Sequence, residues 1–597
     1  MRKTINNNIF ILSYYWKYCR GFFLLRLLTV LLAPVHPIIF IIIMKYAIDA
    51  VAAKRPIEEI LIALAGAFLI VIISSALTNF INYGNGLVAN KIVMGKIQNE
   101  FFSKAETLDY TCFDNPEFYN NYTRAMAETD NRAREVLNNF ISFLSELVTL
   151  LMVLATILFT LRPFVILICA LLIAANFMAN NGKNKNDFKM HTSLTPPARI
   201  MSYVKKIFYE PQYAQEIKLG KLGTLMKKKF GNAVEKDIKI SKKFMISNAF
   251  YNMSFNVIGY ILTFSIMAIS CWQITEGTQT IGDFAASLNA AEQLFKGFYG
   301  LLGSITQMNM HSRFIDNLLY VLNYEPEIME NEDGLEIPES APQNIRFSSV
   351  SFSYPNKKNL VLKNISLDIK PGSKVAFVGY NGAGKTTLVK LLLRLYDPTE
   401  GTIYLGENSY PQYRLKDIRE HFSVVFQDYK CYAVSVAENV SMDDSDTDKE
   451  CLAEALKESG ISEKIEMLEN KENTMLSREF DDNGVILSGG EQQKVAIARA
   501  FYDSHEVLIF DEPSSALDPL AEYELSERIR ELSNNKTVIM ISHRLSTITL
   551  FDEIYMINDG MIIEKGSHNE LMGRKGKYYE MFVKQASNYA IPEELRA

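Results

Sequence analysis

The sequence predicts a chain of two parts: an all-α domain of six membrane-spanning helices with long cytoplasmic helical extensions, followed by an α/β domain. Long apolar stretches fill the first half of the 597 residues. After residue 345, short β-rich runs alternate with helical stretches, which is typical of a largely parallel sheet. The mean hydropathy of +0.01 averages these two unlike halves, and the length exceeds that of one ordinary domain.

Six stretches satisfy or nearly satisfy the requirement for a spanning helix, which is about 20 mostly apolar residues. They lie at residues 22–46, 58–84, 136–160, 163–180, 247–273 and 280–304. Pro34 and Pro37 predict a kink in the first span. The sixth span is the weakest, because it carries several polar side chains.

The connections between these spans set the predicted topology. Residues 85–135 and 181–246 form the two long connections, and the second is rich in lysine. Because Lys and Arg mark the cytoplasmic side of a membrane, both long connections, the N-terminus and the C-terminal half are expected inside the cell. Helical hairpins that reach into the cytosol are the natural structure for such connections.

Changes in composition give the domain boundaries. We assign residues 1–325 to the membrane domain and 345–585 to the α/β domain. Residues 326–344 hold acids and prolines and are interpreted as a linker. Residues 586–597 form a C-terminal tail.

Charge and cysteine content exclude two classes of partner and cofactor. The net charge of −6 is small for this length and there is no basic tail, so no nucleic-acid partner is expected. The six cysteines are scattered without a CxxC pair. This spacing supports neither a zinc site nor a disulfide framework.

A polar stripe runs along the sixth span, where Asn289, Glu292, Gln293 and Lys296 recur at helical spacing, and Glu146 lies in the third span. Charged side chains inside a membrane usually face a water-filled cavity or each other. Glu292 and Lys296 are spaced i,i+4, so a mutual ion pair is the alternative. We interpret these five residues as candidates for the lining of a substrate cavity.

A phosphate-binding loop with the pattern GxxxxGK[ST] opens the α/β domain. The loop follows a predicted strand at 374–378 and precedes a predicted helix. Its backbone N–H groups can surround a phosphate, while Lys385 is expected to reach the β- and γ-phosphates and Thr386 to bind Mg²⁺. The ATP-binding candidates in this loop are Gly379, Tyr380, Asn381, Gly382, Ala383, Gly384, Lys385, Thr386 and Thr387. The loop and its setting indicate a P-loop ATPase domain.

Four further motifs follow this loop. An apolar run ends in Asp511, a candidate metal ligand, and Glu512, a candidate general base or water-orienting group. The turn at 488–491 opens a helix and offers an anion site. Gln427 and His543 each follow an apolar run, at strand ends where parallel sheets place ligands. Alone, each motif could be a strand end, a helix cap or a structural side chain; their order favours a nucleotide site.

In this order the motifs resemble the nucleotide-binding domain of ABC transporters, and the whole chain resembles the exporter type of half-transporter. The resemblance implies ATP and Mg²⁺ as cofactors. Residues 379–387 resemble Walker A and 507–512 resemble Walker B. Tyr354 resembles the aromatic residue that stacks on adenine. Gln427 is similar to the Q-loop glutamine that contacts Mg²⁺.

The resemblance assigns further site residues. The signature motif is Ser488, Gly489, Gly490 and Glu491, the D-loop contains Ser515 and Asp518, and His543 is the switch histidine. The implied catalytic residues are Glu512, His543 and Lys385, and the implied metal ligands are Thr386, Gln427 and Asp511. In this family the signature motif contacts ATP held by the opposite subunit, which implies a homodimer or a heterodimer with a second half-transporter.

The resemblance also predicts two cytoplasmic coupling helices, near residues 112–122 and 210–219. The sequence departs from the family pattern before the signature motif, where Asp482 replaces an expected Glu, and at Glu491, where Gln is commoner. We expect the replacement of Gln by Glu at this position to matter little.

The expected function is ATP-driven export of an amphipathic small molecule or peptide out of the cytoplasm by alternating access. A lipid flippase and an ATP-dependent membrane sensor or regulator without net transport are alternatives. A soluble P-loop ATPase is disfavoured by the six apolar spans. The expected location is a cell membrane in a bacterium, with a multi-pass membrane domain in the lipid bilayer and a cytoplasmic ATPase domain.

Overall fold

The computed structural model divides the chain into two compact units, each described here by itself. Unit 1 comprises Met1–Glu106 and Asn120–Tyr324, and unit 2 comprises Thr107–Tyr119 and Glu325–Ala597. The residues that the structure describes are 2–84, 86–160, 164–328, 330–331, 333–338, 343–355, 357, 359–443, 447–503, 505–513, 524–525, 527–529, 536–543, 545–549 and 551–587.

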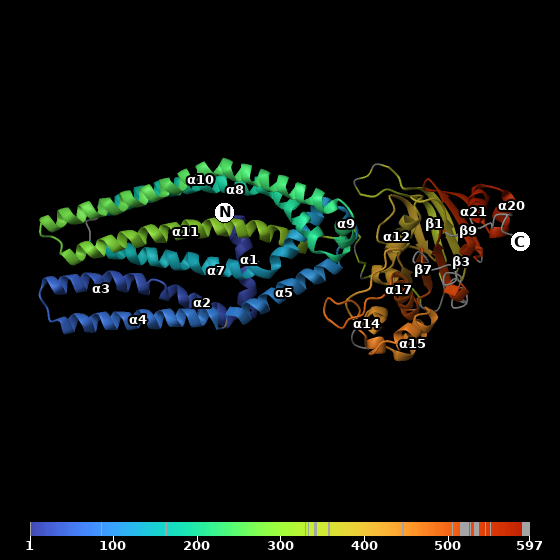
Figure 1. Ribbon diagram of the computed structural model, residues 1–597, viewed down its shortest axis with the longest axis horizontal. Helices are drawn as coiled ribbons and strands as arrows, with labels where there is room; N and C mark the ends of the chain where they lie inside the picture. The colour runs from blue at the N-terminus through green and yellow to red at the C-terminus, as the bar shows by residue number, and fades with distance from the viewer. Residues whose placement is uncertain are drawn as a thin grey trace. The chain divides into compact units, whose positions relative to one another are not determined.

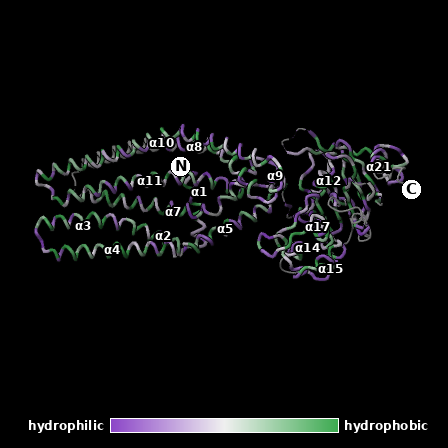
Figure 2. The backbone as a smooth tube through the Cα atoms, in the orientation of Figure 1, coloured by the Kyte–Doolittle hydropathy of each residue, from purple (hydrophilic) through white to green (hydrophobic). Residues whose placement is uncertain are grey.

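Unit 1 is built of helices that run along one another, with α1 crossing the others (Figure 1). They are α1 (Arg2–Tyr18), α2 (Arg20–Leu32), α3 (Val35–Ala52), α4 (Ile57–Tyr83), α5 (Gly86–Glu106), α7 (Pro116–Thr160), α8 (Phe164–Tyr209), η1 (Pro211–Tyr213), α9 (Ala214–Leu219), α10 (Leu222–Thr275) and α11 (Ile281–Leu322). Figure 2 shows that α3 and α4 are largely hydrophobic, as a membrane requires. The two long connections are helical, as predicted, and their cytoplasmic location stays a prediction.

The predicted kink in the first span is present as a break between two helices. Helix α2 ends at Leu32 and α3 begins at Val35. Pro34 lies in the turn between them and Pro37 in the first turn of α3, where a residue without an N–H group costs no helical hydrogen bond.

Among the described residues, four helical stretches are long and apolar enough to cross a membrane. They are Arg20–Ala52, Ile57–Glu106, Asn131–Thr156 and Leu222–Thr275. They contain or overlap the first, second, third and fifth predicted spans. The side chains of the fourth predicted span, residues 163–180, lie outside the described part of the chain. The sixth predicted span forms the start of α11, a helix whose polar stripe keeps it out of this set.

The start of α11 is fastened to α3 by a polar joint. Thr280 and Asp283 form a capping box at the N-terminus of α11. The Asp49 carboxylate of α3 accepts hydrogen bonds from the Gly282 N–H at 2.9 Å and from the Thr280 hydroxyl at 3.0 Å. Lys45 pairs with Asp283 at 2.5 Å. Two helices that are distant in sequence thus share one cap, which satisfies N–H groups that a helix start leaves free.

We expect Gly282→Ala to destabilise the protein by about 1–3 kcal/mol through overpacking. A Cβ at Gly282 would lie 2.4 Å from Cγ of Asp49, so the carboxylate would have to leave its place. Thermal unfolding of the detergent-solubilised chain measures the effect. Gly303→Ala is the matched control on the same helix, because a Cβ there meets no atom within 4 Å. Equal melting temperatures for both variants would contradict the role of this joint.

The described residues of unit 2 form two sheets. The larger has the order β10-β9-β3-β8-β7-β6, in which β10 alone is antiparallel to its neighbour. Its strands are β3 (Lys374–Val378), β6 (Phe422–Val425), β7 (Val507–Asp511), β8 (Thr537–Ile541), β9 (Glu553–Asn558) and β10 (Met561–Gly566). The smaller, antiparallel sheet has the order β2-β1-β4-β5, formed by β1 (Ile345–Phe352), β2 (Leu362–Ile369), β4 (Glu400–Leu405) and β5 (Asn408–Ser409). The sequence analysis did not predict this second sheet.

Helices cover the larger sheet, and the strands between them are buried on both faces. Every residue of β7 and of β8 is buried, as expected for parallel strands beneath helices. The helices of unit 2 include α6 (Thr111–Asp114), α12 (Lys385–Leu392), α13 (Leu415–Glu420), α14 (Val436–Ser441), α15 (Lys449–Glu458), α16 (Ser462–Glu466), α17 (Gly489–Asp503), α19 (Leu545–Ile548), α20 (His568–Arg574) and α21 (Lys577–Ser587). This parallel core positions the candidate site at one edge of the sheet.

The short helix α6 lies in the region predicted for the first coupling helix, and η1 with α9 lies in the second. The segment that holds α6 groups with unit 2, although the rest of the N-terminal half forms unit 1. Its Asp109 carboxylate accepts hydrogen bonds from the N–H groups of Glu327, at 2.5 Å, and Ile328, at 3.3 Å. The predicted linker therefore begins with contacts to this segment.

Candidate functional site

The phosphate-binding loop connects β3 to α12, as its pattern predicts. Gly379 has a φ of 151° and Gly384 a φ of 104°, values that disfavour any residue with a side chain. A Cβ at Gly379 would lie 2.1 Å from the Ile557 carbonyl oxygen, and one at Gly384 would lie 2.6 Å from Leu362. Glycine at these two positions lets the loop fold tightly against its surroundings.

Lys385 begins α12 and is buried. Its ammonium donates hydrogen bonds to the carbonyl oxygens of Gly379 at 2.9 Å and Tyr380 at 3.1 Å. Burial lowers the pKa of Lys385, and the carboxylates of Glu512 and Asp511 oppose that shift. The structure thus holds a cation inside the loop with two carboxylates nearby, where phosphate oxygens could replace the carbonyl partners.

Three of the predicted residues meet at the ends of adjacent parallel strands. Gln427 follows β6, Glu512 follows β7 and His543 follows β8. The Gln427 amide donates to one Glu512 carboxylate oxygen at 3.0 Å. The other oxygen lies 2.5 Å from Nε2 of His543. Residues separated by more than a hundred positions in sequence are therefore joined through one carboxylate.

The protonation states of this trio follow from its surroundings. Burial raises the pKa of Glu512, and Lys385 opposes the rise. Burial and, to a smaller extent, Lys385 lower the pKa of His543. A neutral His543 with its proton on Nε2 donates to Glu512, which fits the short separation. The carboxylate is oriented from both sides, as a general base or water-orienting group requires.

Asp511, at the end of β7, fits a metal ligand. The residue is 1% exposed, and neither carboxylate oxygen has a hydrogen-bond partner among the described residues. Burial raises the pKa of Asp511 to about 6, and the neighbouring Thr386 hydroxyl opposes this rise. An unpartnered buried carboxylate is costly, and a divalent cation shared with Thr386 would satisfy it.

We expect Asp511→Asn to stabilise the nucleotide-free protein near pH 7.5 while it removes hydrolysis. Because the folded-state pKa of about 6 exceeds the unfolded value of about 3.9, the folded protein loses stability as pH rises through that window. The neutral amide avoids this loss, which is about 3 kcal/mol. Thermal unfolding in the presence of a chelator measures it.

The increase in stability from Asp511→Asn should be smaller near pH 5, because the native aspartate is largely protonated there. Asp559→Asn is the control, since that carboxylate is exposed. A lower melting temperature for Asp511→Asn at both pH values would show that the carboxylate is not a buried, uncompensated charge.

Tyr354, the candidate adenine-stacking residue, follows β1 and is partly exposed. Its hydroxyl lies 3.0 Å from the Thr387 hydroxyl of the phosphate loop helix. Its ring contacts Phe352 and Tyr396 edge to face. The structure therefore connects Tyr354 to the phosphate loop, and its contact with adenine stays a prediction.

The candidate signature motif occupies the start of α17, with Ser488 and Gly489 exposed. The Glu491 carboxylate accepts hydrogen bonds from the Ser488 N–H at 2.8 Å and from the Ser488 hydroxyl at 2.9 Å. Lys464 pairs with the other oxygen of Glu491 at 3.3 Å. Glu491 thus caps the helix and holds the serine. The D-loop residues Ser515 and Asp518 lie outside the described residues.

The five candidate cavity residues lie on or against α11. Glu292 and Lys296 form an ion pair at 2.5 Å, and both are more than half exposed. The Asn289 amide donates to the Ala285 carbonyl within the helix, and Gln293 is partly exposed. Glu146 of α7 lies close to this helix, because a Cβ at Gly300 would be 2.7 Å from its carboxylate. The structure thus brings the acid from the third span to the polar stripe.

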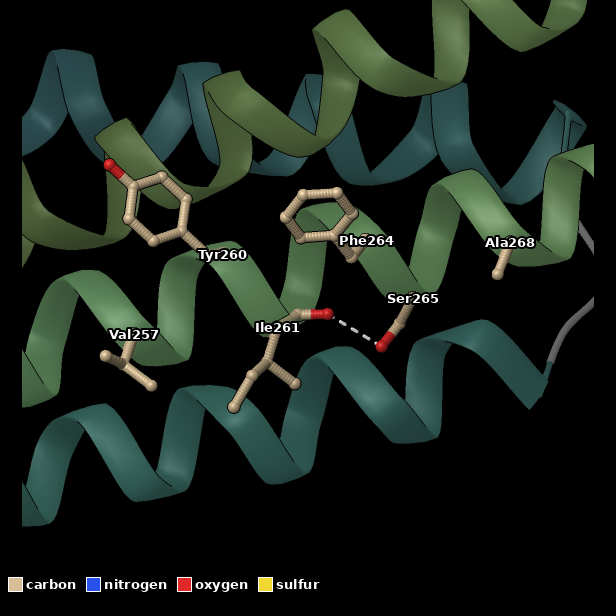
Figure 3. A pocket seen from close by; sticks show the side chains of 6 residues that line it. All are labelled: Val257, Tyr260, Ile261, Phe264, Ser265 and Ala268. Carbon is tan, nitrogen blue, oxygen red and sulfur yellow. Dashed lines mark hydrogen bonds between the residues drawn. The ribbon is translucent and has the colours of Figure 1, made fainter.

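The hollow drawn in Figure 3 lies elsewhere in unit 1, on one face of α10. It is lined by Val257, Tyr260, Ile261, Phe264, Ser265 and Ala268. The Ser265 hydroxyl is bonded to the Ile261 carbonyl at 2.7 Å, so this face offers mainly apolar surface. It contains none of the candidate cavity residues, and its composition suits acyl chains or another apolar surface.

A P-loop site at the ends of parallel strands, with a Ser-Gly-Gly turn and a helical membrane domain, defines an ATP-dependent transporter. The family model described as ABC transporter matches residues 362–515. The matched segment is similar to the ATPase domain of ABC transporters, and the likenesses that follow support an exporter-type half-transporter with ATP hydrolysis coupled to transport.

Curated relatives extend the likeness beyond the ATPase domain. The ATP-dependent lipid A-core flippase of Haemophilus influenzae is 29% identical over 87% of this chain and 88% of its own length. The subtilin transport ATP-binding protein SpaT of Bacillus subtilis is 28% identical over 96% and 93%. Human ATP-binding cassette sub-family B member 5 is 36% identical, over 45% of this chain and 21% of its own.

A solved structure shares the fold. A bacterial Atm1-family ABC exporter with ATP bound matches with a TM-score of 0.80 at 22% identity, and the match covers 96% of this chain and 99% of that one. These likenesses agree with a multi-pass membrane protein that binds ATP.

Proposed function

We propose that two half-transporters, either two copies of this chain or this chain and a second one, bind ATP between them and export an amphipathic small molecule or peptide. The observation that carries the proposal is the exposed Ser488 turn at the start of α17. One chain holds one phosphate loop and one such turn. In an ABC dimer the turn of each subunit faces the ATP of the other, so each chain needs a partner to complete its sites.

The ATP site is assigned by its chemistry. Thr386, Gln427 and Asp511 would hold Mg²⁺, which supplies charge stabilisation at the phosphates when bound. Lys385 would exchange its loop carbonyls for phosphate oxygens. Glu512 would take a proton from, or orient, the attacking water, while Gln427 and His543 hold its carboxylate in place. Closure of the two ATPase domains is then passed to the membrane domain through the helices near 112–122 and 210–219.

The cargo is assigned from the membrane domain. An exposed ion pair such as Glu292–Lys296 is costly against lipid, so we place it in a water-filled pathway. A cargo with both polar and apolar parts fits this pathway best. Lipid export is the second candidate, supported by the flippases among the relatives.

The decisive experiment measures assembly and transport together. The full chain is purified in detergent with its co-purifying partner, and Glu512→Gln is used to trap bound ATP and Mg²⁺. Light scattering should show an ATP-dependent approach of two ATPase domains or a stable dimer. Proteoliposomes are then loaded with fluorescent cationic peptides or with labelled lipid. A monomer under all of these conditions would rule out the shared site, and ATP-dependent movement of lipid alone would favour the flippase.

We expect the double variant Glu292→Gln, Lys296→Met to lose most cargo-stimulated ATPase activity and to keep its basal activity. The two changes remove both charges from the proposed pathway and leave the ATP site untouched. The matched control is Glu235→Gln, Lys239→Met, another exposed i,i+4 pair, on α10 outside the predicted spans. Full stimulation of the Glu292/Lys296 variant by an exported peptide would remove this pair from the pathway.

A further inference from the structure

The Lys390 side chain lies among three tyrosine rings. Its ammonium is 5.1 Å from the ring centre of Tyr110, 5.5 Å from that of Tyr354 and 5.8 Å from that of Tyr396. Among the residues that the structure describes, no carboxylate lies within ion-pair distance of this ammonium. Cation–π attraction to the three rings is therefore the main electrostatic interaction of the Lys390 ammonium. We call Lys390 and the three tyrosines the lysine cage.

The lysine cage joins three separate parts of the chain. Lys390 belongs to α12, the helix of the phosphate loop, and Tyr396 follows that helix. Tyr354 follows β1 and is the candidate adenine-stacking residue. Tyr110 precedes α6, the candidate first coupling helix.

The rings of the cage also contact one another. Tyr396 meets Tyr110 edge to face at 5.8 Å and meets Tyr354 edge to face at 5.4 Å. The buried Tyr396 hydroxyl donates a hydrogen bond to the Asp114 carboxylate of α6. Burial, together with this bond, raises the pKa of Tyr396 above its usual range, so the hydroxyl stays a donor. A change at Tyr354 therefore reaches α6 through its two direct neighbours, Tyr396 and Lys390.

We propose that Lys390 is a positioning residue. It makes the contact between α6 and α12 depend on whether a nucleotide base is stacked on the ring of Tyr354. The inference rests on the proposed function for the role of Tyr354 and goes beyond it in naming the link. A base stacked on Tyr354 takes ring surface that the ammonium now shares. Lys390 then interacts more with Tyr110 and Tyr396, and the contact between α12 and α6 tightens.

The link is specific to the base rather than to the phosphates. Lys385 and the loop glycines would contact the phosphates, whereas Tyr354 is the member of the cage that would contact the base. A ligand with three phosphates and no base should fill the loop and leave the cage unchanged. This difference separates the proposal from a purely structural role for Lys390.

Hydrogen–deuterium exchange of the peptide covering Thr107–Tyr119 tests the proposal. The full chain carries Glu512→Gln so that ATP is not consumed, and exchange is compared without ligand, with saturating ATP–Mg²⁺ and with saturating tripolyphosphate–Mg²⁺. ATP should slow exchange about two- to fivefold, the scale of one cation–π contact, and tripolyphosphate should not. Lys390→Met should abolish the ATP effect, and Lys390→Arg, which keeps a cation, should retain it.

The matched control is Lys416→Met, which removes an exposed lysine paired with Glu420 in the same unit; it should leave the ATP effect intact. Equal slowing by tripolyphosphate, or an unchanged ATP effect in Lys390→Met, would overturn the proposal. So would faster exchange in Lys390→Met by the same factor with and without ATP, since that marks a structural residue only. ATP binding is titrated in every variant: a parent chain that binds no ATP refutes the proposed function, whereas retained binding without the peptide response refutes this inference alone.

Discussion

Replacing Glu512 with glutamine is expected to lower ATP turnover about 10²–10⁴-fold, the usual contribution of a general base, and to leave ATP binding intact. Glutamine keeps the size of the side chain but cannot accept a proton from water. The residue lies between Gln427 and His543, which hold its two oxygens. Phosphate release and equilibrium nucleotide binding, measured on the same preparation, separate the two effects.

The control for this change is Glu420→Gln, at an exposed carboxylate that pairs with Lys416. Its turnover should match that of the native chain. A Glu512→Gln protein with native turnover would mean that another group activates the water, and His543 would become the first candidate.

Replacing Lys385 with alanine is expected to weaken ATP binding about ten- to a hundredfold. A hydrogen bond to a charged group contributes about 1.5–3 kcal/mol, which corresponds to this range of affinity. The change also leaves Asp511 and Glu512 without the cation that opposes their charge. Titration with a fluorescent ATP analogue measures the affinity directly.

Lys416→Ala provides the comparison for Lys385→Ala, because it removes an exposed lysine from the same unit. Native affinity is expected for that control. Tight ATP binding by Lys385→Ala would contradict the assignment of the phosphate loop. Together the Lys385 and Glu512 variants separate binding from chemistry, since the first is expected to lose affinity and the second turnover.

The phosphate loop and the cluster of Gln427, Glu512 and His543 could be predicted because their motifs are local patterns in the sequence. A loop of three glycines and a lysine, or an apolar run that ends in two acids, is visible within ten residues. Parallel strands then bring their carboxyl ends to one edge, so Gln427, Glu512 and His543 had to be neighbours. The kink at Pro34 was predictable for the same reason, since a proline acts on its own helix.

The features that escaped prediction depend on contacts between distant segments. Lys390, Tyr110 and Tyr396 belong to no motif, and nothing near them in sequence indicates that their side chains meet. The bond between Asp49 and the start of α11 is equally non-local. The contact of the Glu491 carboxylate with both polar groups of Ser488 was not predicted either. The antiparallel sheet was missed because its strands lack the long apolar runs of the parallel core.

The grouping of α6 with the ATPase unit has a practical consequence for anyone who excises that unit. A fragment that begins at residue 326 would lack Asp109 and Asp114, so the N–H groups of Glu327 and Ile328 and the hydroxyl of Tyr396 would lose their acceptors. The aromatic surface beneath α6 would then meet solvent and invite self-association. A soluble version of this ATPase for crystallisation or inhibitor screening therefore needs residues 107–119 supplied as a grafted segment.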